Sequence, residues 1–321
     1  MKIVGFNVRG QHRIGVIVDD VVIDLQEVDN RIPSNLADWL RDCGGDWRPL
    51  AEIAQRAPIV ARYPVSDIKF ALPVARPNKI ICLGLNYIKH VNEGRYADNV
   101  PKYPTIFFRC LTSIAPHKSD LLRPLVSASF DYEAELAVVI GQRSKHLTME
   151  NALGCVAAYA CANEGTIREF QRRTTQWDMG KNFDQTGSLG PWLVTADDLP
   201  AGGKGLKIEC RLNGQVMQSD NTENMMFPLR ETLVYITEGI TLEPGDIILT
   251  GTPSGVGHAR TPPVWMKKGD VCEVEIEGIG ILRNFINDER ESNGLEPSRA
   301  ARLNQTGANR IEGRICNDRT V

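Results

Sequence analysis

The sequence has little of what marks several broad classes of protein. Its 321 residues include eight cysteines but no C-x-x-C pair, and three of the cysteines, Cys82, Cys155 and Cys161, lie in apolar surroundings typical of core positions. No apolar run is long enough to cross a bilayer, and the net charge of −3 does not favour nucleic-acid binding. We therefore expect neither a membrane nor a nucleic acid as a partner.

The remaining composition is that of an ordinary globular protein, with 42% hydrophobic and 24% charged residues. Residues 1–5 lead directly into a strand-like pattern, so we expect no signal peptide. Scattered cysteines without such a signal favour reduced thiols. The sequence thus predicts a cytoplasmic protein.

Two changes of pattern divide the chain. Residues 1–72 contain short strand candidates and one helix, which begins after Ser34 or Asn35 and stops at Gly44-Gly45. A break containing two prolines follows, and from Asp288 onward few apolar residues remain. We expect a small N-terminal α/β cap or oligomerisation domain at 1–72, a catalytic domain at 78–288 and a polar tail at 289–321.

The most informative stretch is 131–141, DYEAELAVVIG, whose aromatic and β-branched residues predict a strand. Residues two apart on a strand share a face, so Glu133 and Glu135 point the same way on an otherwise apolar surface. Two neighbouring carboxylates there are costly to desolvate unless something compensates them. A hard divalent cation such as Mg²⁺, Mn²⁺ or Ca²⁺ is one candidate, and a solvated edge strand with two outward acids is the alternative.

Three more segments offer polar groups beside predicted strands. His90 and Glu93 are three residues apart in a segment with helical spacing, which suits a general base held by a carboxylate but also an ordinary surface pair. Glu164 follows the buried strand predicted at 155–162 and could supply a third carboxylate. Lys181 lies in a loop and has the surroundings of a buried side chain.

A glycine-rich loop follows the strand predicted at 245–250. It lacks the G-x-x-x-x-G-K-[ST] pattern of a P-loop, so nucleotide binding is disfavoured. Its amides and the Thr252 hydroxyl instead suit a small anion such as a carboxylate. The sequence thus predicts an anion site on this loop.

In combination and in order, these stretches resemble the fumarylacetoacetate hydrolase family. The resemblance covers about residues 78–288, and it is carried by the ordered set rather than by any single motif. The set comprises residues 84–87 with His90 and Glu93, the D-Y-E-A-E run, Asn163-Glu164 with Arg168 and Gln171, Gly180-Lys181, the Asn213-Gly214 hairpin with Gln218, residues 250–253 after 242–246, and residues 268–270.

The resemblance implies a mostly β fold with some α (α+β), a β-roll of mixed sheets that is usually a homodimer. It also implies a divalent cation, Mg²⁺ or alternatively Mn²⁺ or Ca²⁺, and a small-molecule oxo-acid as the substrate. By role, the residues implied are Glu133, Glu135 and Glu164 for the metal, His90, Glu93 and Lys181 for catalysis, and Arg109, Gln171 and Thr252 for substrate oxygens.

For the reaction, the resemblance implies first a metal-dependent hydrolase that cleaves a C–C bond in an acylpyruvate-like or β-diketo acid. The alternative is a decarboxylase or tautomerase of a β-keto dicarboxylic acid, such as oxaloacetate or an intermediate of aromatic catabolism. A metal-binding paralogue without turnover is the non-enzymatic alternative. The family usually has Asp where this chain has Glu164, which leaves the identity of the metal and the rate open.

Overall fold

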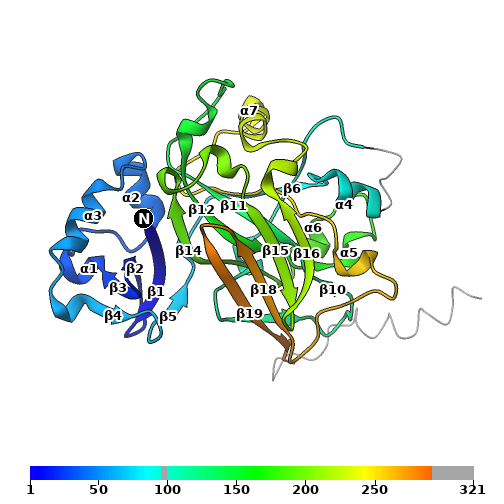
Figure 1. Ribbon diagram of the computed structural model, residues 1–321, viewed down its shortest axis with the longest axis horizontal. Coiled ribbons are helices and arrows are strands. Elements are labelled where there is room, and N and C mark those ends of the chain that lie inside the picture. The colour runs from blue at the N-terminus through cyan, green and yellow to red at the C-terminus, as the bar shows by residue number, and fades with distance from the viewer. Residues whose placement is uncertain (95–99, 291–321) are drawn as a thin grey trace, which may run out of the picture. The chain divides into compact units, whose positions relative to one another are not determined.

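The computed structural model describes residues 1–94 and 100–290, and residues 1–288 form one compact unit. Its architecture is α+β, with two large sheets and short helices (Figure 1). A third, two-stranded ribbon pairs β10 (Phe130–Asp131) with β13 (Thr166–Ile167). The fold class expected from the sequence, α+β with mixed sheets, is confirmed.

The larger sheet has twelve strands in the order β4-β3-β2-β1-β14-β12-β11-β17-β6-β7, with β5 on β1 and β8 on β14. Most neighbours are antiparallel, whereas β17–β6 and β14–β8 are parallel. The strands are β1 (Lys2–Val8), β2 (Gln11–Val18), β3 (Val21–Asp24), β4 (Arg62–Pro64), β5 (Lys69–Ala71), β6 (Ile80–Gly84), β7 (Thr105–Phe108), β8 (Ile114–Pro116), β11 (Ala134–Ile140), β12 (Val156–Asn163), β14 (Gly187–Thr195) and β17 (Ile247–Leu249).

The smaller sheet has five strands in the order β16-β15-β18-β19-β9, and only the β19–β9 pair is parallel. Its strands are β9 (Asp120–Arg123), β15 (Lys207–Leu212), β16 (Gln215–Asn221), β18 (Val271–Ile276) and β19 (Gly280–Asp288). The helices are α1 (Leu25–Val28), α2 (Leu36–Cys43), α3 (Arg48–Gln55), α4 (Ile88–Glu93), α5 (Arg168–Gln171), α6 (Asp178–Lys181) and α7 (Leu229–Gly239).

Strand β11 contributes to two cores, because successive residues of a strand point to opposite faces. Leu136 and Val138 pack with Val274 of the smaller sheet, whereas Ala137 and Val139 belong to a second core with Leu40 of α2. All seven residues of β11 are buried. A strand covered on both faces has no polar face, which explains the continuous apolar run in its sequence.

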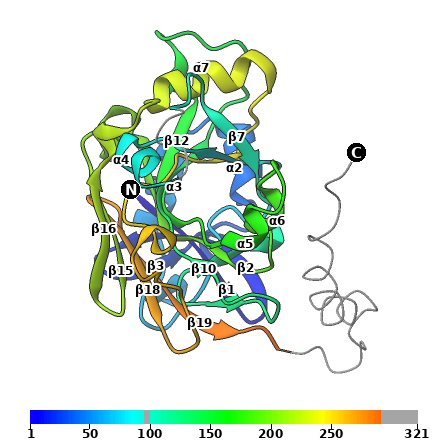
Figure 2. The same ribbon diagram turned by 90° about the vertical axis from the view of Figure 1, so that its right-hand side faces the viewer.

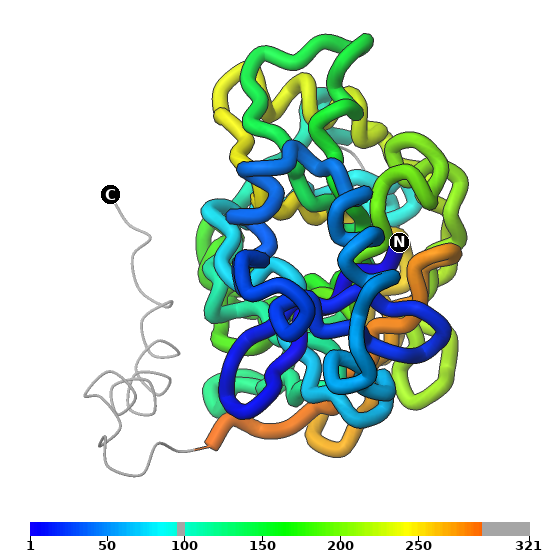
Figure 3. The backbone as a smooth tube through the Cα atoms, turned by 90° about the vertical axis from the view of Figure 1, so that its left-hand side faces the viewer, coloured from blue at the N-terminus to red at the C-terminus, as the bar shows by residue number. Residues whose placement is uncertain are grey.

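The N-terminal residues are built into the same unit as the rest. Strand β1 pairs with β14, with Lys2 opposite Val194, and Leu36 and Leu40 of α2 share a core with Ala158 of β12. Figure 3 faces this end of the unit, with the N-terminal segment in front. Residues 1–72 thus belong to the same compact unit as the residues that follow them, and a role as a cap or oligomerisation domain stays a prediction. The tail predicted at 289–321 lies outside the described residues, except for its first two.

The strand predicted over 131–141 is interrupted near its start, because side chains accept from the backbone amides there. The amide N–H groups of Tyr132, Glu133 and Ala134 donate to the side-chain oxygens of Asp131, Asn163 and Gln218, at 2.9 Å each. Strand β10 ends at Asp131, and β11 begins at Ala134. This interruption lies where the acidic residues gather.

Other local predictions hold. Asn213 and Gly214 have φ values of 53° and 80° and connect β15 to β16, as a type I′ turn requires. Helix α2 begins after Asn35 and ends at Gly44, whose φ is 61°.

Figure 2 shows α5 and α6 lying side by side. Within 1–94 and 100–290, no helix is long and apolar enough to cross a membrane.

His117 makes the stability of this fold dependent on pH. Its Nδ1 accepts the amide N–H of Arg283 at 3.0 Å, and burial, with smaller effects of Lys118 and Arg283, lowers its pKa from 6.5 to about 4. The folded state thus prefers the neutral ring, and the stabilisation that depends on the neutral ring is fully present above pH 6.5. As the pH falls toward 4 this stabilisation is lost, and the free energy of unfolding decreases by about 3 kcal/mol in all.

We expect His117→Asn to remove this dependence, since an Asn carbonyl can accept the same N–H without titrating in this range. Urea unfolding at pH 7 and pH 4.5 measures the effect. Between these values wild type should lose about 2 kcal/mol more unfolding free energy than the variant. Equal losses in the two proteins would mean that His117 is not the group responsible.

Candidate active site

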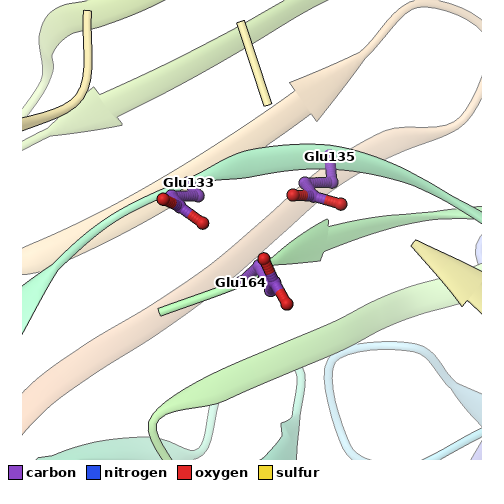
Figure 4. Close-up of side chains that lie close together, drawn as sticks. All are labelled: Glu133, Glu135 and Glu164. Carbon is purple, nitrogen blue, oxygen red and sulfur yellow. The ribbon is translucent and has the colours of Figure 1, made fainter. Parts of the chain in front are cut away.

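Three buried glutamates converge at the ends of two neighbouring strands. Glu135 lies on β11, Glu133 immediately precedes that strand, and Glu164 immediately follows β12. The strands are antiparallel, and the amide N–H of Glu164 donates to the carbonyl oxygen of Glu133 at 2.8 Å. One carboxylate oxygen from each residue lies within 4.8 Å of the others (Figure 4). Glu133 and Glu135 therefore point into the same cluster, as predicted from their spacing. The alternative, an edge strand with two acids in solvent, is excluded because each of the three side chains is at most 4% exposed.

Two cations neutralise part of the cluster. The Lys181 Nζ lies 2.5 Å from Glu133 Oε2 and 2.7 Å from Glu164 Oε2. Arg168 pairs with Glu133 through Nη2 and with Asp131 through Nε at 2.7 Å. Burial alone would raise the pKa of Glu133, but Arg168 and Lys181 bring it well below the usual range. Glu133 is therefore ionised at neutral pH.

The other two glutamates are less fully compensated. Burial, together with Glu164 and Glu133, raises the pKa of Glu135 well above its usual range, and the hydrogen bond from the Gly251 amide only partly offsets this. Burial also raises the pKa of Glu164, against the effect of Lys181. Its Oε1 is buried without a hydrogen-bond partner among the described residues, and Arg109 Nη1 lies 3.8 Å away.

These features fit a hard divalent cation. The donors are all carboxylate oxygens, which Mg²⁺, Mn²⁺ and Ca²⁺ prefer. A cation would lower the raised pKa values of Glu135 and Glu164, and it would give the buried Glu164 Oε1 a partner. Glu133, Glu135 and Glu164 are thus the residues that would hold it.

The glycine-rich loop at 251–258 binds the protein's own carboxylates. The amide of Gly251 donates to Glu135, and that of Gly255 donates to Glu93, both at 2.8 Å. The amides of Gly257 and His258 donate to Asp131 at 2.7 and 3.1 Å. The prediction that these amides serve a small anion is corrected in this respect: the anions are acidic side chains of the chain itself.

His90 and Glu93 form a held pair rather than a surface pair. Both lie on α4, and His90 Nδ1 is 2.8 Å from Glu93 Oε1. The imidazole side chain is only 10% exposed, and the other Glu93 oxygen accepts the Gly255 amide. Because Nδ1 faces a carboxylate, it carries the proton in the neutral ring, which leaves Nε2 as the acceptor.

A pocket brings these groups together. It contains about 580 Å³ of space, including its open mouth, and β6, β7 and Trp177 supply its apolar wall. Of the predicted substrate-binding residues, Gln171 and Thr252 line it; Gln171 Oε1 accepts from Arg168 at 3.0 Å, and Thr252 Oγ1 accepts from Gln218 at 2.8 Å. The polar lining consists of His90, Glu133, Glu135, Glu164, Arg168, Gln171, Arg172, Lys181, Thr252 and His258.

Arg109 differs from the other two predicted substrate-binding residues. Its guanidinium donates to Ser113, to the carbonyl of Gly165 and to Thr186, at 3.1 to 3.4 Å, and the side chain is fully buried. It does not line the pocket. In this structure Arg109 supports the backbone behind Glu164, and its role in holding substrate oxygens stays a prediction.

The fold brings three further residues to the site, and no role was predicted for them from the sequence. Asp131 continues the two-residue spacing of Glu133 and Glu135, so the same alternation could have identified it. Arg168 belongs to the ordered set of the resemblance but had no partner assigned. His258 follows the glycine-rich loop, and no local pattern marks it.

Comparison with known proteins agrees with this geometry. Residues 79–287 match the family described as "Fumarylacetoacetate (FAA) hydrolase C-terminal". The mitochondrial oxaloacetate tautomerase Fahd2a of Rattus norvegicus is 40% identical over 269 residues, which are 83% of each chain.

Solved structures that share the fold include two for which the match covers 90% of this chain and 100% of theirs. They are a fumarylacetoacetate hydrolase from psychrophilic Exiguobacterium antarcticum, with a TM-score of 0.78 and 33% identity, and the maleylpyruvate hydrolase from Sphingobium sp. SYK-6, with a TM-score of 0.74 and 25% identity. From the match over 79–287 and the extent of these similarities, this chain belongs to the fumarylacetoacetate hydrolase family.

Proposed function

We propose that this protein is a divalent-metal-dependent enzyme that interconverts the keto and enol forms of a short 2-oxo dicarboxylic acid such as oxaloacetate. The observation that carries the proposal is the meeting, in one pocket, of a buried tri-carboxylate cluster and an oriented imidazole. Enolisation needs these two parts: stabilisation of developing negative charge on oxygen and a base for a proton on carbon.

The metal would be held by Glu133, Glu135 and Glu164, and Mg²⁺ or Mn²⁺ suits such an all-oxygen set. When bound, it would supply Lewis-acid polarisation of the 2-oxo group. Lys181 lines the same pocket, and its positive charge would stabilise the negative charge of an enolate oxygen. Gln171 and Thr252 would orient substrate oxygens from the pocket wall.

His90 is the proposed base for the carbon-bound proton. Glu93 holds its Nδ1–H, so Nε2 has the lone pair that takes the C3 proton of the substrate. In the reverse direction the same nitrogen, now protonated, returns that proton to carbon. The apolar wall provided by Leu83, Phe107 and Trp177 would limit the access of water to the reacting carbon.

The similarity to oxaloacetate tautomerases, at 40% identity over 83% of the chain, leads us to favour this reaction over the C–C hydrolysis expected first. Hydrolysis of an acylpyruvate is the second candidate, because an imidazole held by a carboxylate can also activate water. The similarity to a fumarylacetoacetate hydrolase supports it. Both reactions would use the same cluster.

A direct assay tests the proposed reaction. Freshly dissolved enol-oxaloacetate loses its ultraviolet absorbance as it ketonises, and the enzyme with Mg²⁺ or Mn²⁺ should accelerate this loss well above the buffer rate. His90→Gln should lower kcat by about 10²- to 10⁴-fold, the usual worth of a general base. The same substitution at His146, which is exposed, is the control and should change nothing.

Product analysis separates the two candidates. Acylpyruvates with and without a distal carboxylate are incubated with the enzyme and followed by NMR. Cleavage into pyruvate and an acid, without acceleration of ketonisation, would favour the hydrolase and overturn the tautomerase. Retention of the full ketonisation rate in His90→Gln would instead remove His90 from the mechanism.

Metal binding should stabilise the fold through Glu164. Free metal at a hundredfold excess over Kd stabilises by about 3 kcal/mol, so melting with Mg²⁺ or Mn²⁺ should occur several degrees higher than with EDTA. Glu164→Ala should lose most of this shift, whereas Glu164→Asp should keep it. Glu52→Ala, an exposed glutamate on α3, is the control. A full metal-dependent shift in Glu164→Ala would show that Glu164 is not a ligand.

A further inference from the structure

The pocket contains a second imidazole held by a carboxylate. His258 Nδ1 lies 3.2 Å from Asp131 Oδ2, and the His258 side chain is 12% exposed. It lines the same pocket as His90. Among the described residues, Nδ1 of this ring has a hydrogen-bond partner and Nε2 has none. Nε2 is also not one of the fully buried side-chain atoms that lack a partner, so it keeps some contact with solvent.

Asp131 fixes the tautomer of this ring. Its carboxylate is fully buried and accepts from the amides of Tyr132 and Gly257 and from Arg168 Nε, at 2.7 to 2.9 Å. Its Oδ1 accepts from the Gly257 amide, and its Oδ2 accepts from the His258 amide and pairs with the Arg168 guanidinium, which is the arrangement of an ionised carboxylate. An ionised carboxylate can only accept hydrogen bonds, so His258 Nδ1 carries the hydrogen. Nε2 of the neutral ring is then an acceptor on a side chain that lines the pocket.

The two imidazole–carboxylate pairs are built alike and held by one loop. In each, Nδ1 faces a carboxylate, and the carboxylate also accepts an amide of the glycine-rich loop: Gly255 for Glu93 and Gly257 for Asp131. A Cβ at Gly257 would lie 2.6 Å from Asp131 Oδ1, so the close approach of this amide depends on glycine. The loop therefore sets the orientation of both rings relative to the pocket.

We propose that His258 is a second proton-transfer residue, which exchanges the proton of the substrate's enol oxygen at its Nε2 while His90 serves the carbon. This rests on the proposed function and adds a residue to it. In the enol-to-keto direction, the C=C electron pair takes a proton from His90 Nε2 and forms the C3–H bond. The electron pair of the enol O–H bond forms the C=O bond, and its proton passes to His258 Nε2.

The step balances without any other reactant. One ring gains a proton and the other loses one, and exchange with solvent restores both between turnovers. The charged groups that face His258 are Asp131, Arg168 and Arg172. Burial, Arg168 and Arg172 outweigh Asp131 and lower the pKa of His258, so the ring is neutral at pH 7 and ready to accept a proton.

The test is ketonisation of enol-oxaloacetate by His258→Asn in the presence of Mg²⁺. An Asn amide can replace Nδ1–H as the donor to Asp131 but has no equivalent of Nε2. We expect kcat to fall at least tenfold, with KM changed less than threefold and the melting temperature unchanged. The kcat–pH profile should also lose one ionisation. His146→Asn, at an exposed position with φ of 53° that Asn tolerates, is the matched control and should behave as wild type.

A kcat within threefold of wild type would overturn the proposal. So would a rise in KM with unchanged kcat, because that marks a binding role, or an unchanged pH profile, because that marks a purely structural one. If His258→Asn does not fold, His258→Gln is judged by the same criteria. Wild-type enzyme without catalysed ketonisation would reject the proposed function itself, and active wild type with active His258 variants rejects only the role of His258.

Discussion

The site depends on one constraint: acidic side chains buried at the ends of two central strands must each find a partner. Isolated buried carboxylates are very costly, so the chain surrounds them with donors. Lys181 and Arg168 serve Glu133, and loop amides serve Glu135 and Asp131. Helices α5 and α6 and the glycine-rich loop carry these donors. The compensation remains incomplete at Glu135 and Glu164, and this incompleteness is what makes the cluster suitable for a cation.

The same constraint ties the acid–base groups to the metal-type cluster. Arg168 contacts both Glu133 and Asp131, and Asp131 in turn holds His258. A single loop then supplies amides to Glu135, to Asp131 and to the partner of His90. Movement of that loop would therefore disturb the cluster and both imidazoles at once. Rigidity of this kind is what preorganised electrostatic stabilisation requires.

Much of this could be predicted from sequence where the determinants are local. Because side chains alternate between the two faces of a strand, the spacing of Glu133 and Glu135 predicted that they lie together. The pair Asn213-Gly214 predicted the turn between β15 and β16. Long-range pairing could not be predicted: the break after residue 72 suggested a separate domain, but β1 pairs with β14, nearly two hundred residues away. Nor does sequence tell which partner a polar group will choose. The resemblance implied that Arg109 holds substrate oxygens, yet in this structure its guanidinium donates to oxygens of the protein itself.

Glu164 shows how one methylene changes the balance within such a cluster. Its Oε2 binds Lys181, while its Oε1 remains without a hydrogen bond and within reach of the other two glutamates. One carboxylate thus joins the fixed cation of the protein to the place that a metal would take. An Asp at this position would offer the same two oxygens on a side chain shorter by one methylene. Because Glu164 binds Lys181 with one oxygen and keeps the other for a cation, the departure from the usual family residue is compatible with the same chemistry.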